Sequence, residues 1–192
     1  MFRTRVLGTG LVLAAAVGAV VAFAATAKPA VKPASSAAAR IARGQYLVSV
    51  MGCTDCHTPG TLFGGPDMKR QFAGSELGWK GPWGTSFARN LTPDLDTGLG
   101  YWSENEIVKF LRTGNKPDGK QALPPMPWPN TAQLTEADVH AVAAFLMSVP
   151  KISHKVPDAL PPGQDYSGPT LVFPAPGAWD APVGAPPEAA KK

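Results

Sequence analysis

The chain has two cysteines, which lie three positions apart, and a histidine follows the second one directly. They form the sequence Cys53-Thr54-Asp55-Cys56-His57 within a chain of 192 residues. This C-x-x-C-H spacing is typical of covalent haem attachment, in which the two thiols bond the porphyrin and the histidine binds the iron. A small chain must fold around so large a group, so the motif constrains the architecture more than any other feature.

Three other interpretations of the cysteines fit less well. A redox dithiol usually lies in a strand–helix context, and no strand is predicted here. A disulfide between cysteines this close would close almost no loop and so contribute little stability. A zinc site needs two more ligands at matching spacing, whereas His140 falls in a predicted helix and His154 in the tail. The motif therefore favours one covalent haem c.

The first 27 residues have the composition of an export signal. Arg3 and Arg5 precede a run of apolar and small residues from Val6 to Ala25, and small-residue cleavage sites follow. The same run is long enough to be an uncleaved membrane anchor. We expect a signal peptide at residues 1–27, and both alternatives place the rest of the chain in the periplasm, either free or tethered to the membrane.

The charge balance bears on possible partners, and the composition along the chain indicates its domain organisation. Outside the leader, 16 basic residues stand against 14 acidic ones, a balance that argues against nucleic acid as a partner. The chain holds 21 Pro and 20 Gly, which indicates a small core with long irregular segments. We predict a flexible spacer at residues 28–39, one folded domain at residues 40–150, and a Pro-rich disordered tail at residues 151–192.

Three helices are predicted in the folded domain, at residues 40–52, 103–114 and 135–149. Apolar residues recur at helical spacing in each. Ser103 and Glu106 form a capping box at the start of the second helix. Residues 57–100 show no sustained period and are predicted to be loop with short turns. The predicted fold class is therefore all-α, with few helices and long loops wrapped around the haem.

An electron carrier needs a second axial ligand, so that the iron changes oxidation state without binding substrate. Met126 lies 69 residues after His57 in a loop stiffened by prolines, which leaves enough chain to reach the other haem face. Met51 is too close to the motif, and Met147 falls on the apolar face of the third helix, where it is expected to pack in the core. Met68 lies in a loop and remains an alternative. We predict His57 and Met126 as the iron ligands.

With these features, residues 40–150 resemble the class I cytochromes c. The resemblance is most particular to the cytochrome modules of bacterial alcohol and gluconate dehydrogenase complexes, which typically carry three haem motifs where this chain has one. The stretches that carry it are residues 89–94 (RNLTPD), 97–102 (TGLGYW), 112–114 (RTG) and 125–128 (PMPW). The resemblance implies the class I cytochrome c fold.

The resemblance also implies specific contacts. The first and last helices are expected to cross closely, with Gly44 and Leu47 against Phe145 and Leu146. A backbone carbonyl is expected to accept a hydrogen bond from the proximal histidine. The candidates for this carbonyl are Pro59 and Pro66. Trp102 or Asn90 is expected to bond a haem propionate, with a core role as the alternative for Trp102.

The sequence as a whole predicts a one-electron carrier between a donor and an acceptor redox protein, with no catalytic residue. One alternative is a cytochrome subunit of a membrane-associated dehydrogenase or oxidase complex. A haem peroxidase or gas sensor would need an open sixth position, and Met126 argues against it. Basic residues that could rim an exposed haem edge, or simply be solvated, are Lys69, Arg70, Lys80, Lys116 and Lys120.

Overall fold

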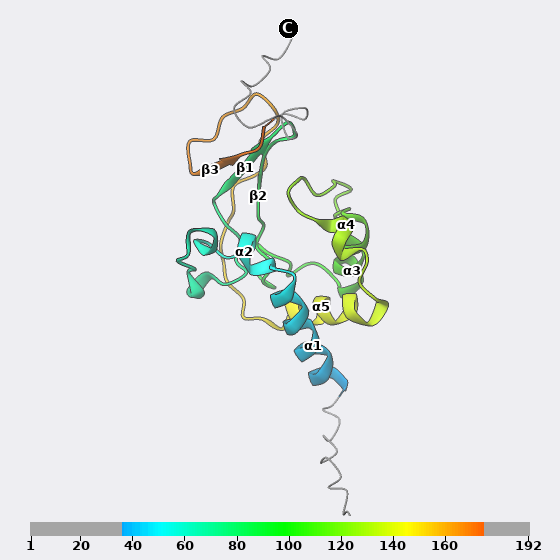
Figure 1. Cartoon of the computed structure of the whole chain (residues 1–192). Helices are drawn as coiled ribbons and strands as arrows, with labels where there is room; N and C mark the ends of the chain where they lie inside the picture. Colours follow the sequence, from blue (N-terminus) through cyan, green and yellow to red (C-terminus); the bar gives the residue numbers. More distant parts are fainter. Residues whose placement is uncertain (1–35, 175–192) are drawn as a thin grey trace, which may run out of the picture. The chain divides into compact units, whose positions relative to one another are not determined.

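The computed structural model describes residues 36–174, so the predicted signal peptide and most of the predicted spacer lie outside the described residues. This part of the chain contains five α-helices, two 3-10 helices and three strands (Figure 1). The helices are α1 (Ser36–Val50), α2 (Cys53–His57), α3 (Glu104–Thr113), α4 (Trp128–Thr131) and α5 (Glu136–Ser148), with η1 (Thr61–Phe63) and η2 (Met68–Arg70). None of the described helices is long and apolar enough to cross a membrane.

The second and third predicted helices begin at the predicted capping residues. Ser103 accepts a hydrogen bond from the backbone of Glu106, whose carboxylate accepts one from the Ser103 backbone, so the capping box at α3 is complete. Gly114 ends α3 in the left-handed conformation, at φ 69°. The side chain of Thr135 caps α5 by accepting a hydrogen bond from the backbone of Asp138. Helix α1 begins earlier than predicted, at Ser36, so part of the predicted spacer is helical.

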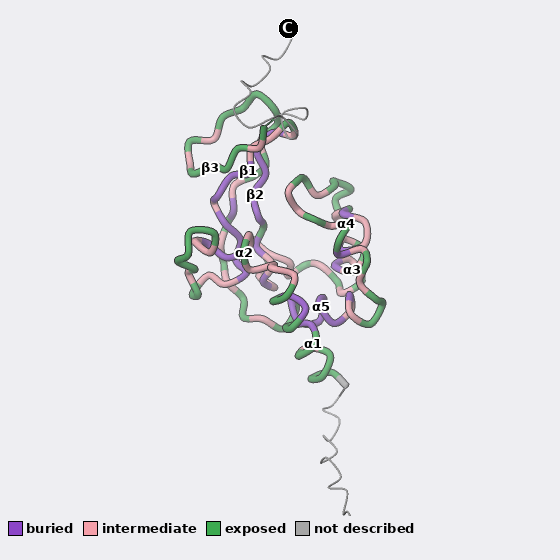
Figure 2. The backbone as a smooth tube through the Cα atoms, viewed as in Figure 1, coloured by how far each residue is buried: buried purple, intermediate pink, exposed green. Residues whose placement is uncertain are grey.

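Helices α1 and α5 cross at Gly44, as expected. A Cβ atom at Gly44 would lie 2.0 Å from the Ala141 carbonyl oxygen and 2.7 Å from Cβ of Phe145, so only glycine lets the two helices approach this closely. Leu47 and Leu146 are buried beside this crossing, and much of α5 is buried (Figure 2). The core cluster includes Leu47, Val48, Phe72, Ile107, Leu111, Val139, Val142, Phe145 and Leu146.

The fold-class prediction is confirmed only in part, because a small sheet accompanies the helices: two of its strands lie in the region predicted to be loop and the third in the predicted tail. Strands β1 (Gly78–Gly81) and β2 (Gly84–Phe87) form an antiparallel hairpin, and β3 (Thr170–Val172) pairs in parallel with β1, in the order β2-β1-β3. Each strand is short, and the hairpin contains three glycines, a residue depleted in strands. Its pairing is supplied by distant segments, which a local pattern does not reveal.

The prediction of a disordered tail is wrong for residues 151–174, which we call the C-terminal strap. Val156 is 2% exposed, and Leu160 exchanges two backbone hydrogen bonds with Thr85, both 2.9 Å long. The strap lacks helical period because backbone bonds to other segments order it, and its prolines suit an extended path. Residues 175–192 of the predicted tail lie outside the described residues.

Candidate haem-binding site

The attachment motif forms the short helix α2, directly after α1. Gly52, at φ 68°, separates the two helices. Cys53 and Cys56 are free thiols, partly exposed, and their spacing places them on the same side of a helix. Burial raises the pKa of the Cys53 thiol to about 11 and also raises that of Cys56, so both thiols are protonated near neutral pH.

The ring of His57 is oriented by a backbone carbonyl. Its Nδ1 lies 2.6 Å from the carbonyl oxygen of Arg89, an acceptor, so this nitrogen carries the proton and donates. Burial lowers the pKa of His57, although the bond to Arg89 acts in the opposite direction, and the ring is neutral near pH 7. Its Nε2 therefore keeps a free lone pair, which is the state a haem iron requires.

The expectation that Pro59 or Pro66 supplies this carbonyl is wrong. The Pro59 carbonyl accepts a hydrogen bond from the Asp67 backbone instead. The acceptor for His57 is Arg89, 32 positions downstream and two residues after the end of β2. Arg89 begins one of the stretches that carry the family resemblance, but nothing in that stretch indicated this role, because a carbonyl has no sequence signature of its own.

The backbone of His57 is held as well. Its carbonyl accepts a 2.8 Å hydrogen bond from the backbone of Gly74. Gly74 has φ 86°, and a Cβ atom there would lie 2.5 Å from Cγ2 of Val156 and 2.7 Å from the Ala88 carbonyl oxygen. Only glycine fits a backbone with this φ and these neighbours. The ring and the main chain of His57 are thus fixed by separate segments.

The predicted propionate partners have other contacts. Asn90 is 1% exposed; its Nδ2 donates to Ile152 and Thr97, and its Oδ1 accepts from Thr92. Because these partners within the protein occupy its polar atoms, Asn90 does not suit the predicted role of propionate donor. Trp102 packs edge-to-face on Phe110 with ring centres 5.7 Å apart, which agrees with a core role.

The loop that carries Met126 is fixed at both ends. Ser86, on β2, donates a 2.5 Å hydrogen bond from Oγ to the carbonyl oxygen of Pro124. On the other side, Trp128 packs so closely on Gly114 that a Cβ there would lie 2.7 Å from its ring. Met126 itself is half-buried. Residues 84–90 therefore contact both predicted ligand regions, through Ser86 for the Met126 loop and through Arg89 for His57.

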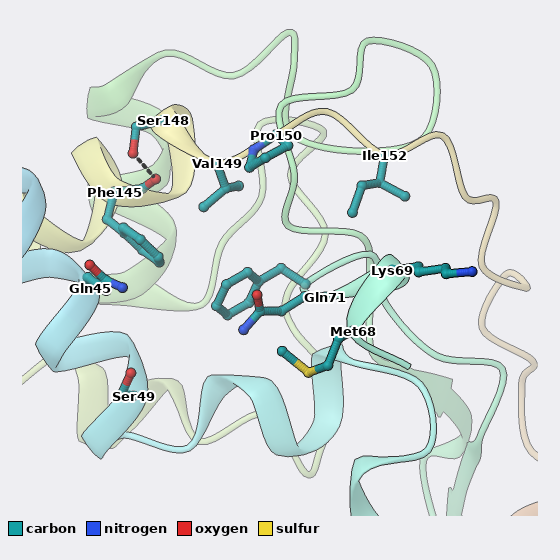
Figure 3. Close-up of a pocket in the computed structure, with 11 residues that line it drawn as sticks. Gln45, Ser49, Met68, Lys69, Gln71, Phe145, Ser148, Val149, Pro150 and Ile152 are labelled. Atoms are coloured by element: carbon teal, nitrogen blue, oxygen red, sulfur yellow. Dashed lines mark hydrogen bonds between the residues drawn. The ribbon is translucent and has the colours of Figure 1, made fainter. Parts of the chain in front are cut away.

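Met68, the alternative ligand, lies elsewhere. It is 60% exposed and lines a surface pocket of about 470 Å³ between α1, η2 and the end of α5 (Figure 3). The pocket is also lined by Gln45, Ser49, Phe145 and other residues, but by none of the attachment motif. The position of Met68 therefore favours Met126 as the distal ligand.

The remaining histidines and three of the five basic residues predicted to rim a haem edge have carboxylate partners. His140 contacts Glu104 and Glu136, and His154 contacts Glu76, so neither is associated with the cysteines. No group of three or more His, Cys, Asp or Glu suited to a metal ion occurs within residues 36–174. Among the basic residues, Arg70, Lys80 and Lys120 form ion pairs with nearby carboxylates.

The residues present fit a covalently bound haem. The two thiols are free, His57 has one ring nitrogen fixed and the other available, and a thioether lies in a loop anchored to the same segment that orients the histidine. Thiols at this spacing suit thioether bonds to the porphyrin, and a neutral imidazole suits the iron.

Comparison with known proteins agrees with this chemistry. The profile of the cytochrome c family matches residues 41–150. The chain is 37% identical over 123 residues to the cytochrome c subunit of a quinone-dependent alcohol dehydrogenase from Gluconobacter oxydans, covering 62% of this chain and 24% of that protein. It is 33% identical over 116 residues to the fructose dehydrogenase cytochrome subunit of Gluconobacter japonicus, covering 60% of this chain and 22% of that subunit.

A third relative, a dihaem c-type cytochrome from Cereibacter sphaeroides, is 39% identical over 114 residues, which cover 57% of this chain and 36% of that protein. The chain thus spans well under half the length of these relatives. The family match covers more than half of the chain and includes both the attachment motif and the Met126 loop. The chain belongs to the cytochrome c family, whose domain carries electrons on covalently bound haem c and has the class I cytochrome fold.

Proposed function

We propose that the chain carries single electrons in the periplasm on one haem c, bonded to Cys53 and Cys56 and ligated by His57 and Met126. The observation that carries the proposal concerns His57, the residue directly after the second cysteine. Its Nδ1 donates a 2.6 Å hydrogen bond to the carbonyl oxygen of Arg89. It fixes the ring and its tautomer, and leaves Nε2 available for iron. A surface histidine without this support would not be held ready for a ligand role.

The chain's residues supply the environment for electron transfer. When bound, the haem supplies an iron that alternates between Fe(III) and Fe(II). Met126 offers a thioether, which favours the ferrous state and raises the reduction potential. The buried core of α1, α3 and α5 gives the domain an apolar interior. His57 and Met126 would together hold the iron and leave no position open to small ligands, and the exchange partners would be donor and acceptor redox proteins.

A second candidate is a cytochrome subunit of a membrane-associated dehydrogenase complex. The relatives in Gluconobacter are cytochrome subunits of an alcohol dehydrogenase and a fructose dehydrogenase, and this chain matches about a quarter of their length. This candidate uses the same haem and differs in its partner. Co-purification of the native protein from membranes with a dehydrogenase would favour it, whereas recovery as a free protein would favour the independent carrier.

Optical spectroscopy with redox titration tests the proposal. The purified holoprotein is measured oxidised, reduced, and reduced with carbon monoxide. We expect a low-spin spectrum in both states, a weak red band of sulfur ligation in the oxidised protein, a reversible one-electron couple and no response to carbon monoxide. A high-spin spectrum that shifts at once with carbon monoxide would contradict the His/Met assignment and indicate an enzyme or a sensor.

Ser86→Ala is expected to loosen the Met126 loop. It removes the hydroxyl that donates to Pro124, and a buried hydrogen bond contributes about 1 kcal/mol, so the form with Met126 detached should become about fivefold more populated. The measurement is a titration with azide, in which loss of the red band reports binding and the midpoint gives the affinity.

Ser75→Ala is the matched control for Ser86→Ala. It also removes a buried hydroxyl, but its Oγ bonds to the backbone of Leu77 rather than to the loop. We expect azide to bind more tightly to Ser86→Ala than to the control. Equal azide affinity in the two variants would show that Ser86 does not secure the distal loop.

A further inference from the structure

The C-terminal strap is hydrogen-bonded to residues 89–92, the segment that includes the carbonyl that orients His57. The Ile152 carbonyl accepts a 2.8 Å hydrogen bond from Nδ2 of Asn90, the residue after Arg89. The Ile152 backbone also donates to Oγ1 of Thr92, at 3.1 Å. The Arg89 guanidinium donates to the Pro157 carbonyl, at 2.8 Å. Residues 89–92 are therefore bonded to the strap through three side chains.

The strap also contacts Ala73 and Gly74, the segment that bonds the main chain of His57. His154 contacts the Ala73 carbonyl with Nδ1, at 2.7 Å, and Glu76 with Nε2, at 2.8 Å. Val156, which is 2% exposed, packs directly on Gly74. Gly74 is the donor to the His57 carbonyl. Strap residues 152–157 thus hold both the segment at Ala73–Gly74 and the segment at Arg89.

These contacts include hydrogen bonds of buried side chains, which a segment that merely covered the surface would not need. Asn90 is 1% exposed and Thr92 is fully buried, so the side-chain ends of their bonds to the half-buried Ile152 are shielded from water. Hydrogen bonds in such an environment hold geometry more firmly than exposed ones. Farther along, the strap is tied to the hairpin through Leu160, β3 and the exposed ion pair of Asp165 with Lys80, and to the Glu76 carbonyl through the Tyr166 hydroxyl. The buried side chains of Asn90 and Thr92 thus bond the strap close in sequence to Arg89, whose carbonyl orients His57.

We propose that Asn90 and Arg89, by clamping the C-terminal strap, are positioning residues for His57 that set the strength of its Nδ1–H hydrogen bond. The inference rests on the proposed haem function and adds a control over the reduction potential. A strong bond from Nδ1 increases electron donation by the imidazole, which stabilises the ferric state. Loosening the strap should lengthen this bond and raise the potential.

Two variants test this role in the full-length holoprotein. Asn90→Ala removes the bond to Ile152 without changing charge, and Arg89→Gln removes the bond to Pro157. Lys80→Gln is the matched control for Arg89→Gln, because it also removes one positive charge that contacts the strap, but at Asp165. The direct readout is solvent exchange of the His57 Nδ1 proton, measured by nitrogen NMR on the reduced protein. The second readout is the potential.

We expect exchange of this proton to be about tenfold faster in Asn90→Ala and about threefold faster in Arg89→Gln, and unchanged in Lys80→Gln. The potential of Asn90→Ala should rise, and that of Arg89→Gln should lie above that of Lys80→Gln. Arg89→Lys, which keeps the charge and one donor, should restore most of the slow exchange. This rescue separates positioning from a general loss of stability.

Exchange rates and potentials equal to those of the control would overturn the inference and leave the haem function intact. If Asn90→Ala does not fold, Arg89→Gln, with its control and rescue, decides the result alone. The wild-type holoprotein is measured first. Absence of covalent haem there would overturn the proposed function itself, so the two failures are distinguishable.

Discussion

Met126→Ala is expected to keep its haem covalently attached but to bind carbon monoxide at once. The substitution removes the only thioether in the loop that Ser86 and Trp128 hold in place, so the sixth iron position opens. Loss of sulfur ligation should lower the reduction potential by an amount on the order of 0.1 V, within the roughly 0.8 V range that axial ligands control. Optical spectra with carbon monoxide and a redox titration measure both effects.

Met68→Ala is the matched control for Met126→Ala. Met68 is 60% exposed in a pocket that no residue of the attachment motif lines, so its loss should change neither the spectrum nor the potential. If Met68→Ala opened the sixth position and Met126→Ala left the spectrum unchanged, the ligand assignment would be reversed.

Gly44→Ala is expected to destabilise the folded protein by about 3 kcal/mol, the upper end of the usual cost of overpacking. The new Cβ would lie 2.0 Å from the Ala141 carbonyl oxygen, a main-chain atom that cannot move without shifting α5. Denaturant unfolding of the holoprotein, followed by its absorbance, measures the change. Because α1 leads directly into α2, the attachment motif should loosen together with the crossing.

Gly65→Ala provides the matched control, because a Cβ atom there would meet nothing within 4 Å. This control should change the free energy of unfolding by less than about 0.5 kcal/mol, as is usual for surface substitutions. Equal stabilities of Gly44→Ala and Gly65→Ala would show that the α1–α5 crossing does not depend on close approach at Gly44.

Local signals in the sequence were enough to predict the later helices, and the family resemblance predicted the helix crossing. Ser103, Glu106 and Gly114 are capping residues that act through their immediate neighbours, so their effect can be recognised in the sequence. The small residue at Gly44 was predicted from the family resemblance and is confirmed by its contact with α5.

The features that the sequence did not predict depend on contacts between distant residues. The carbonyl of Arg89 orients His57 across 32 positions, and any residue type presents a carbonyl. The strap is ordered by backbone bonds such as those between Leu160 and Thr85, which leave no hydrophobic period. Prolines and glycines in β1, β2 and the strap matched loop and disorder patterns, although tertiary contacts order these segments.

Haem retention on a denaturing gel tests the central claim most directly. The protein is produced in cells able to mature c-type cytochromes, together with a variant in which Cys53 and Cys56 are both replaced by Ala. The account predicts haem staining at the position of the wild-type chain and none for the double variant, because only thioether bonds survive denaturation. A wild-type chain without retained haem would contradict the account.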